Sequence, residues 1–397
     1  MKRLIQYMIP IMILFFLLPP VAIAEEDSST LAESTAGKYV EQQLEHLGTN
    51  EIEDFWEKVK TEYNGYLPEN QPLGLKDFFQ LEGSIFSFDL FKGFLKYIFH
   101  ELLINGKLLG SIIILTVFSM ILENIQTAFE KNSVSKVAYS ITYLVILLLA
   151  MNSFYVAMGY AKDAISNMVN FMMALMPLVL ALMASVGNIT SVSLFHPLIV
   201  FLVNVSGVLI YSVVFPLLFF SAILGIISTF SEEYKVTQLS NLLRNISIGF
   251  LGMFLTIFLG VVSVQGATSA VLDGVTIKTA KFITGNFVPV VGRMFTDATD
   301  TVIGASLLAK NTVGLAGVII LLLLCAFPAL KIIAIAFIFN LSAALLQPLG
   351  SSNVITCLNI IGKSLIFVFA ALATVCLMFF LAITMVIAAS NLSVMVR

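Results

Sequence analysis

Long apolar runs separated by short polar stretches dominate the chain after residue 107. A helix needs about 20 apolar residues to cross a hydrocarbon core of about 30 Å. By this measure we predict seven membrane spans and one further helix, at 277–298, that lies at the interface or re-enters the membrane. The spans are 108–129, 137–158, 165–186, 196–230, 246–264, 315–346 and 364–389.

Two of these apolar runs are longer than one bilayer requires. The runs 196–230 and 315–346 contain Pro216 and Pro328, and a proline inside a helix removes one backbone hydrogen bond. We therefore expect each run to tilt, kink or split at its proline. Segment 277–298 differs from the spans because Lys281 and Arg293 lie too close together in sequence to reach opposite sides of a membrane.

The amino-acid composition indicates which class of protein carries this pattern. Hydrophobic residues make up 59% of the 397 residues, charged residues 11%, and the mean hydropathy is +0.99. Soluble domains carry about 25% charge, so the sequence excludes a soluble enzyme. The predicted fold class is an all-α polytopic membrane protein with about seven to eight transmembrane helices and proline-broken helices.

The first 24 residues have the order of a cleavable secretory signal. Lys2 and Arg3 precede an apolar stretch, two prolines follow it, and Ala22-Ile23-Ala24 offers small residues for cleavage after Ala24. The alternative is a retained anchor helix, because residues 5–24 could just span a bilayer. Either way, residues 25–106 are expected to be carried across the membrane.

The exported region is acidic, with 16 Asp and Glu against 6 Lys and Arg. Asn50 and Glu53 resemble a capping box. The helix they would open carries apolar residues on one face, namely Ile52, Phe55, Val59 and Tyr63. An aromatic-rich helix over 86–102, with Lys92 and Lys96 between its phenylalanines, suits the membrane interface. The alternative for this second helix is a face that docks a partner.

Basic residues set the expected orientation of the spans. Lys131 and Lys136 lie between the first two spans, which favours the cytoplasm for that loop. Counting spans onward places 266–310, with its lysines and arginine, in the cytoplasm as well. On α-helical spacing, Gly252, Thr256 and Gly260 form a small-residue stripe that favours close packing of another helix.

The spacing of prolines indicates an internal duplication. Pro177 and Pro289 are 112 residues apart, as are Pro216 and Pro328. The alternative is chance, because other identities in this register are sparse. The expected division is a signal peptide (1–24), an acidic helical extracytoplasmic region (25–106), a two-helix hairpin (107–160), a first membrane repeat (161–265) and a second one (266–397).

Motifs for catalysis or metal binding are incomplete. His100-Glu101 lacks the second histidine of a zinc-protease motif, since position 104 is Ile104, and Gly362-Lys363-Ser364 lacks the leading glycine of a phosphate loop. Three cysteines lie in apolar stretches and are expected to be buried and unpaired, namely Cys325, Cys357 and Cys376. We expect neither an enzyme nor a cofactor or metal site. No basic stripe indicates nucleic acid.

The candidate functional residues are therefore the charged residues and the helix-breaking prolines and glycines that lie within apolar segments. Lys331, three residues after Pro328, either faces a partner or cavity or extends to the interface. Segment 278–300 is the expected transport path or hinge, and the alternative is a solvated loop. The candidate residues are Lys281, Gly285, Pro289, Gly292, Arg293, Pro216, Pro328 and Lys331.

Several short strings resemble the stage III sporulation protein AE family of endospore-forming bacteria. The resemblance covers essentially the whole chain, signal peptide included, and rests on the strings Asn105–Gly110, Gln265–Thr268, Thr279–Phe287, Gly292–Thr296, Leu346–Gly350 and Asn359–Ser364.

The resemblance implies a multi-pass protein of the mother-cell membrane around the forespore, with its N-terminal region facing the intermembrane space. It implies a channel complex with the other stage III A-type proteins and, through them, with stage II sporulation protein Q. It carries over no catalytic residues. The alternatives are a stand-alone transporter for a small solute and a structural scaffold. Few charges lie within the spans, which weighs against ion-coupled transport.

Overall fold

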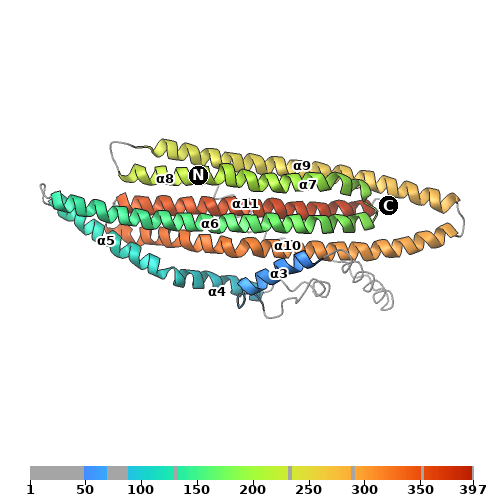
Figure 1. Cartoon of the computed structure of the whole chain (residues 1–397), viewed down its shortest axis with the longest axis horizontal. Helices are drawn as coiled ribbons and strands as arrows, with labels where there is room; N and C mark the ends of the chain where they lie inside the picture. The colour runs from blue at the N-terminus through green and yellow to red at the C-terminus, as the bar shows by residue number, and fades with distance from the viewer. Residues whose placement is uncertain are drawn as a thin grey trace.

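The computed structural model describes residues 49–68, 88–128, 133–230, 235–287, 291–349 and 353–395. All regular structure in these ranges is helical, as the sequence predicts (Figure 1). The helices are α3 (Asn50–Glu62), α4 (Phe88–Ile104), α5 (Gly106–Ala128), α6 (Ser133–Ser185), α7 (Ile189–Leu209), η2 (Ile210–Val214), α8 (Phe215–Phe230), α9 (Thr237–Phe287), α10 (Val291–Leu346), η3 (Gln347–Leu349) and α11 (Asn353–Met395).

Within the described ranges, five helical segments are long and apolar enough to cross a membrane, and a bent pair, α4 with α5, makes up to six. The bend between α4 and α5 is 44°. These helices confirm the predicted polytopic all-α class. The signal peptide and its cleavage at Ala24 lie outside the described residues.

The predicted break between the second and third spans is wrong. Residues 137–158 and 165–186 belong to one helix, α6, which has 53 residues and is about 80 Å long. Lys162 and Asp163 look like a loop in the sequence. On α6 both side chains are exposed, so the helix accommodates them without a turn.

The long helices continue past their prolines. Pro216 is the second residue after the π-helical turn η2, where the Phe215 N–H donates to the Ile210 carbonyl, so the backbone adjusts next to the proline. Pro177 and Pro328 lie inside α6 and α10, which continue through them. Of the three, only Pro216 adjoins a change of helix type.

The long elements alternate in direction along a single bundle (Figure 1). The end of α5 and the start of α6 lie at one end, and the junction of α9 with α10 lies at the other, with the α6–α7 turn and the end of α11. The prediction puts 129–136 and 266–310 on one side of the membrane, whereas the start of α6 and the α9–α10 junction lie at opposite ends of the bundle. The difference arises because two predicted spans join into α6, which removes one crossing from the count.

The ends of the predicted segments also move. Segment 277–298, expected as one helix, is divided between the end of α9 and the start of α10. The expected boundaries at 160/161 and 265/266 fall inside α6 and α9. Repetition of the two membrane parts stays a prediction, because Pro289 lies outside the described residues.

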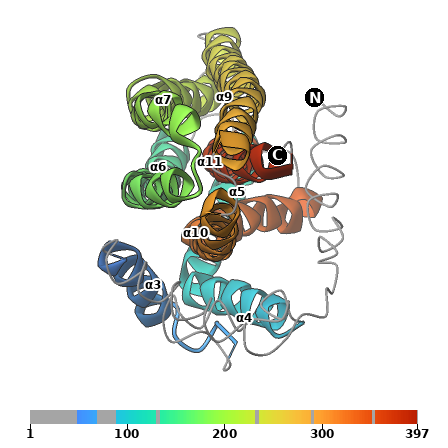
Figure 2. The same ribbon diagram turned by 90° about the vertical axis from the view of Figure 1, so that its right-hand side faces the viewer.

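Seen along the bundle, α3 and α4 lie on the side of α10 away from α7 and α9 (Figure 2). The core forms where α10 packs against α6 and α11. Gly317 lets α10 approach Leu175 of α6, and Gly362 lets α11 approach Asn340 of α10. Close approach at glycine is the packing mode expected between membrane helices.

Candidate functional site

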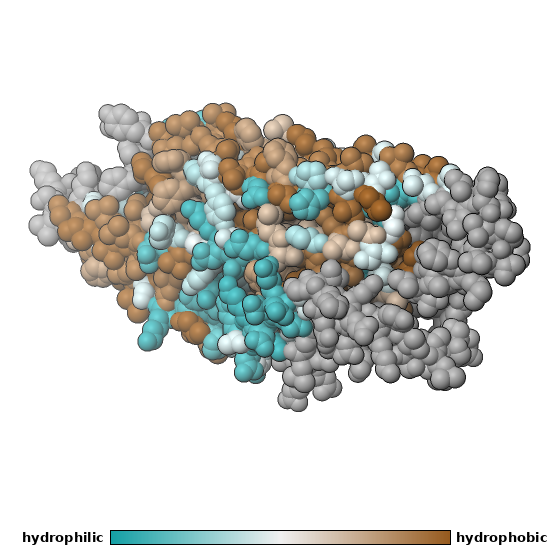
Figure 3. Space-filling view, turned by 45° about the vertical axis from the view of Figure 1, so that its right-hand side comes forward, coloured by the Kyte–Doolittle hydropathy of each residue, from teal (hydrophilic) through white to brown (hydrophobic). Residues whose placement is uncertain are grey.

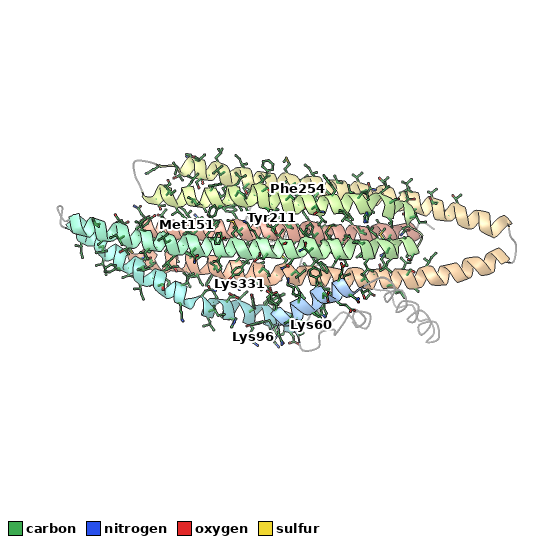
Figure 4. The ribbon with its side chains drawn as sticks, in the orientation of Figure 1. Lys60, Lys96, Met151, Tyr211, Phe254 and Lys331 are labelled. Carbon is green, nitrogen blue, oxygen red and sulfur yellow. The ribbon has the colours of Figure 1, made fainter. Side chains whose placement is uncertain are left out.

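The strongest candidate site is the junction where α3 and α4 meet α10. We define the junction by Tyr63, Tyr97, Glu101, Phe327 and Lys331. Figure 4 shows Lys331 on α10 beside the part of the molecule where Lys60 of α3 and Lys96 of α4 lie. Helices of the N-terminal region and one of the long apolar helices therefore share this site.

An ion pair links α4 to α10 at the junction. The Lys331 Nζ is 3.6 Å from the Glu101 Oε1, and the Glu101 side chain is only 6% exposed against 29% for Lys331. The Asn105 amide donates to the other carboxylate oxygen at 3.3 Å. The Lys331 ammonium also lies 4.3 Å from the centre of the Tyr160 ring, a cation–π distance.

This pairing gives Lys331 a specific acidic partner. The side chain also keeps partial access to solvent. A carboxylate this buried is stable as an anion only with a counter-charge and hydrogen bonds, and Lys331 and Asn105 supply them. The pair therefore ties the bend between α4 and α5 to the middle of α10.

Aromatic rings cover the other side of the junction. Tyr63 stacks on Phe327 with ring centres 3.8 Å apart and planes 7° apart. Tyr97 contacts both of these rings edge-on, at 6.0 and 5.0 Å. Phe327 directly precedes Pro328, so the segment after α3 rests on α10 one turn from Lys331.

The Tyr63 hydroxyl is buried beside a carboxylate. It donates to the Glu62 Oε1 at 2.9 Å. Burial raises the pKa of Tyr63 well above its ordinary value, and the neighbouring Glu62 charge raises it further. Tyr63 is therefore neutral at physiological pH, and its stacking on Phe327 does not place a charge against the core.

The helix α3 is held by α6 as well. Phe55 packs edge-on against Phe171 at 5.4 Å, and the Lys58 ammonium donates to the Asn167 side chain at 3.0 Å. An open pocket of about 370 Å³ lies between the two helices. It is lined by Glu51, Asp54, Phe55, Asn170, Met173 and Ala174.

The start of α3 differs from the sequence prediction. Thr49, not Asn50, occupies the N-cap position, and its side chain makes no capping hydrogen bond, so the predicted capping box is wrong. The predicted apolar face is confirmed for Ile52, Val59 and Tyr63, and Trp56 joins it. Trp56 follows Ile52 by four residues, so the helical spacing in the sequence could have identified it as part of this face.

A second polar cluster lies at the end of the bundle that holds the α6–α7 turn, and sequence reasoning missed it. The Asp273 carboxylate on α9 accepts hydrogen bonds from the backbone N–H groups of Thr190 and Ser191 at 3.0 Å each. It therefore occupies the positive end of α7. Nearby in sequence, Asn188 donates to the Ser390 hydroxyl at 2.6 Å.

Lys310 is fully buried on α10 and donates to the Asn391 side chain at 2.7 Å. Together with Asp273 it ties α7, α9, α10 and α11 at one end. Asp273 and Lys310 lie between predicted segments, where charged residues are ordinarily solvated, so their burial could not be predicted from the sequence. Both make defined hydrogen bonds, which fits a structural role.

The predicted transport-path residues lie around the end of α9 and the start of α10. Lys281 and Gly285 belong to α9, and Gly292 and Arg293 belong to α10, with side chains outside the described residues, as is Pro289. The three cysteines are buried and unpaired, as predicted. In the described part of the chain no three potential metal ligands lie together.

Comparison with known proteins gives two matches. A family model described as Stage III sporulation protein AE matches residues 75–390. A protein of Bacillus subtilis (strain 168), named Stage III sporulation protein AE, is 57% identical over 372 residues. That alignment covers 94% of this chain and 91% of the relative. No solved structure matches the chain.

Proposed function

Because the chain belongs to the stage III sporulation protein AE family, we propose that it is a membrane subunit of the channel complex that connects mother cell and forespore. Family membership assigns it a role in sporulation, and its long apolar helices make it a multi-pass membrane protein. The observation that carries the proposal is the 57% identity, which extends over nearly the whole chain.

The proposed location is the mother-cell membrane around the forespore, with the N-terminal region in the intermembrane space. There the chain would contact the other stage III A-type proteins and, through them, stage II sporulation protein Q. The outward side of α3 supports a contact role, because Glu51, Asp54 and Glu57 are exposed while the apolar side of α3 is fixed to the bundle. Figure 3 shows hydrophilic surface on the side where α3 lies.

The outer side of α9 offers a second contact surface. Gly252, Thr256 and Gly260 are exposed, and nothing lies within 4 Å of a Cβ built on either glycine. The stripe therefore packs on no helix of the described chain. Within a membrane it would allow the helix of another subunit to approach closely, which supports a subunit role.

The subunit role is tested by reversing charge on α3. The full chain with Glu51, Asp54 and Glu57 changed to lysine should insert normally but lose co-purification with the other stage III A-type proteins and arrest forespore development. A matched control changes Thr237, Gln238 and Asn245, which are exposed at the start of α9, to lysine. Normal development of the α3 variant with its partners still bound would contradict this contact.

A second experiment separates the subunit from a stand-alone transporter. We propose that the chain is not catalytic and acts only together with its partners, so purified protein alone in liposomes should carry no solute flux. Flux without partners would favour the transporter. The transport path at Lys281, Gly285, Pro289, Gly292 and Arg293 stays a prediction. Arg293→Ala should block channel-dependent development at unchanged protein level.

A further inference from the structure

The outward side of α6 changes character at one point along its length. Among its exposed residues from Val137 to Val156, all except Asn152 are large and apolar, namely Val137, Ile141, Leu144, Val145, Leu148, Tyr155 and Val156. From Lys162 onward the exposed residues are polar, small or proline, namely Lys162, Asp163, Ser166, Asn170, Pro177, Ala184 and Ser185. Hydrocarbon suits the first surface and water suits the second.

Aromatic and charged groups gather where this change occurs. Tyr155 is 68% exposed, and Tyr160 lies against the Lys331 ammonium. The Tyr211 hydroxyl donates to the Lys162 carbonyl at 2.6 Å. Tyrosine and lysine concentrate at the boundary between lipid and water. This level of the bundle therefore has the chemistry of a membrane surface.

The helix α3 excludes lipid from the part of α6 beyond this level. It packs on α6 at Asn167 and Phe171, and its charged side chains Glu51, Asp54, Glu57 and Lys58 are exposed. Each charged side chain costs about 2.5–3.5 kcal/mol or more at the centre of a bilayer. A helix with this surface cannot lie in hydrocarbon.

The helix α4 fits the same boundary. It is bent by 44° from α5. Phe88, Phe91 and Phe99 are each more than half exposed along one side of it, and Lys92 and Lys96 are exposed beside them. Such a helix suits the headgroup level, where rings enter the lipid and ammonium groups remain in water.

A second aromatic level lies toward the opposite end of α6. Tyr139 stacks with Tyr143, and the Tyr143 hydroxyl is hydrogen-bonded to the Thr229 hydroxyl of α8. Twenty-one residues separate Tyr139 from Tyr160, which in an α-helix is about 32 Å. This matches the hydrocarbon thickness of about 30 Å.

We propose that lipid covers α6 only from about Tyr139 to Tyr160, and that Lys162–Ser185 stands outside the hydrocarbon on the side where α3 lies. The apolar residues of this outer part are accounted for by burial within the protein. Met168, Phe171, Met172 and Leu175 are each fully buried against other helices. Contacts with other helices thus account for the apolar run 165–186 of α6.

The test measures depth along α6 in the purified full-length protein in liposomes. Cys325, Cys357 and Cys376 are replaced by alanine, and one nitroxide is attached at a time at exposed positions 141, 148, 156, 166, 170 and 185. Oxygen, which concentrates in lipid, should relax the first three labels more strongly. A water-soluble nickel chelate should relax the last three more strongly.

Two outcomes would overturn the proposal. Stronger relaxation by oxygen than by the nickel chelate at every labelled position up to 185 would mean that lipid covers the whole helix. Low accessibility to both reagents at 166, 170 and 185 would mean that another protein copy covers this side. Thermal unfolding of each labelled variant within a few degrees of the unlabelled protein ensures that the labels report the folded bundle. The measurement is independent of the partners, so its result does not depend on the proposed channel role.

Discussion

At the residue scale, the ion pair between Glu101 and Lys331 explains a charge in an apolar run. The sequence shows Lys331 as an isolated cation, because its partner lies 230 residues earlier in the chain. The pair closes only when the bend between α4 and α5 packs on α10. Removing either partner leaves the other charge without its counter-ion at a site that is largely dry on the Glu101 side.

We expect Lys331→Met to destabilise the protein by about 1–3 kcal/mol. This is less than the ~3–5 kcal/mol of a fully buried pair, because Lys331 keeps some contact with water. Thermal unfolding in detergent measures the loss. The matched control is Lys363→Met, since Lys363 is exposed on α11.

The double variant Glu101→Gln with Lys331→Met should recover much of that stability, because no unpaired charge remains. Equal losses from Lys331→Met and Lys363→Met would show that the pair contributes nothing specific. Additive losses in the double variant would lead to the same conclusion.

Tyr63 should make the docking of α3 sensitive to high pH. Its pKa is raised in the docked state, so docking favours the neutral phenol. That stabilisation is complete below the ordinary tyrosine pKa of about 10 and is lost as pH rises above it. Trp56, the single tryptophan of the chain, is buried on α3, and its fluorescence reports docking.

Wild-type Trp56 emission should shift to longer wavelength above about pH 10. The variant Tyr63→Phe retains the stacking ring but cannot ionise, so its shift should be much smaller. Identical pH profiles for the two proteins would exclude Tyr63 as the cause.

At the element scale, the local sequence pattern decides which side of a helix is buried, and tertiary contacts decide how helices pack together. The apolar period gives α3 its buried side, but a glycine decides how the next segment packs. A Cβ at Gly93 of α4 would collide with the main-chain carbonyl of Tyr66, so the turn after α3 rests directly on the α4 backbone. Glycine lowers helix propensity, but the close approach of the Tyr66 carbonyl to the α4 backbone requires it at this position.

Gly93→Ala should push the turn at 63–66 away from α4 and weaken α3 docking by about 1–3 kcal/mol. The change is measured by Trp56 emission and by denaturant sensitivity. Gly110→Ala, on α5, is the matched control because nothing lies within 4 Å of its added Cβ. The control should be neutral or up to about 1 kcal/mol more stable. Equal effects would contradict direct packing at Gly93.

At the scale of the whole molecule, the number of crossings fixes which ends share a compartment. If all six candidate spans of the described ranges cross the membrane, their antiparallel course places the α6–α7 turn, the α9–α10 junction and the end of α11 on one side (Figure 1). If the signal exports residues 25–106, this is also the side of α3. Lys281 and Arg293 would then lie opposite to where basic-residue bias alone places them.

We expect alkaline phosphatase fused after Arg397 to be active, because this enzyme matures only outside the cytoplasm. The same enzyme fused after Lys235, which follows α8 at the opposite end, should be inactive. Fluorescent-protein fusions at the two positions should give the reverse pattern. Activity after Lys235 and none after Arg397 would invert the orientation, and equal activity would contradict six passes.

The sequence by itself determined the class of protein, the apolar side of α3, the burial of the cysteines and the family. These follow from local period, composition and short strings, which need no knowledge of distant contacts. The sequence also marked Lys331 as unusual. It could not identify Glu101, because any acidic residue of region 25–106 was an equal candidate.

Only the tertiary structure decided how many times the chain reverses. Lys162 and Asp163 signal a loop by composition, yet on α6 they point outward while neighbouring residues pack inside. Hydropathy cannot separate a residue buried by lipid from one buried by protein, because both environments lack water. The run 165–186 therefore reads as a span in sequence, although protein surrounds much of it, and one misplaced turn reversed the sides of all later segments.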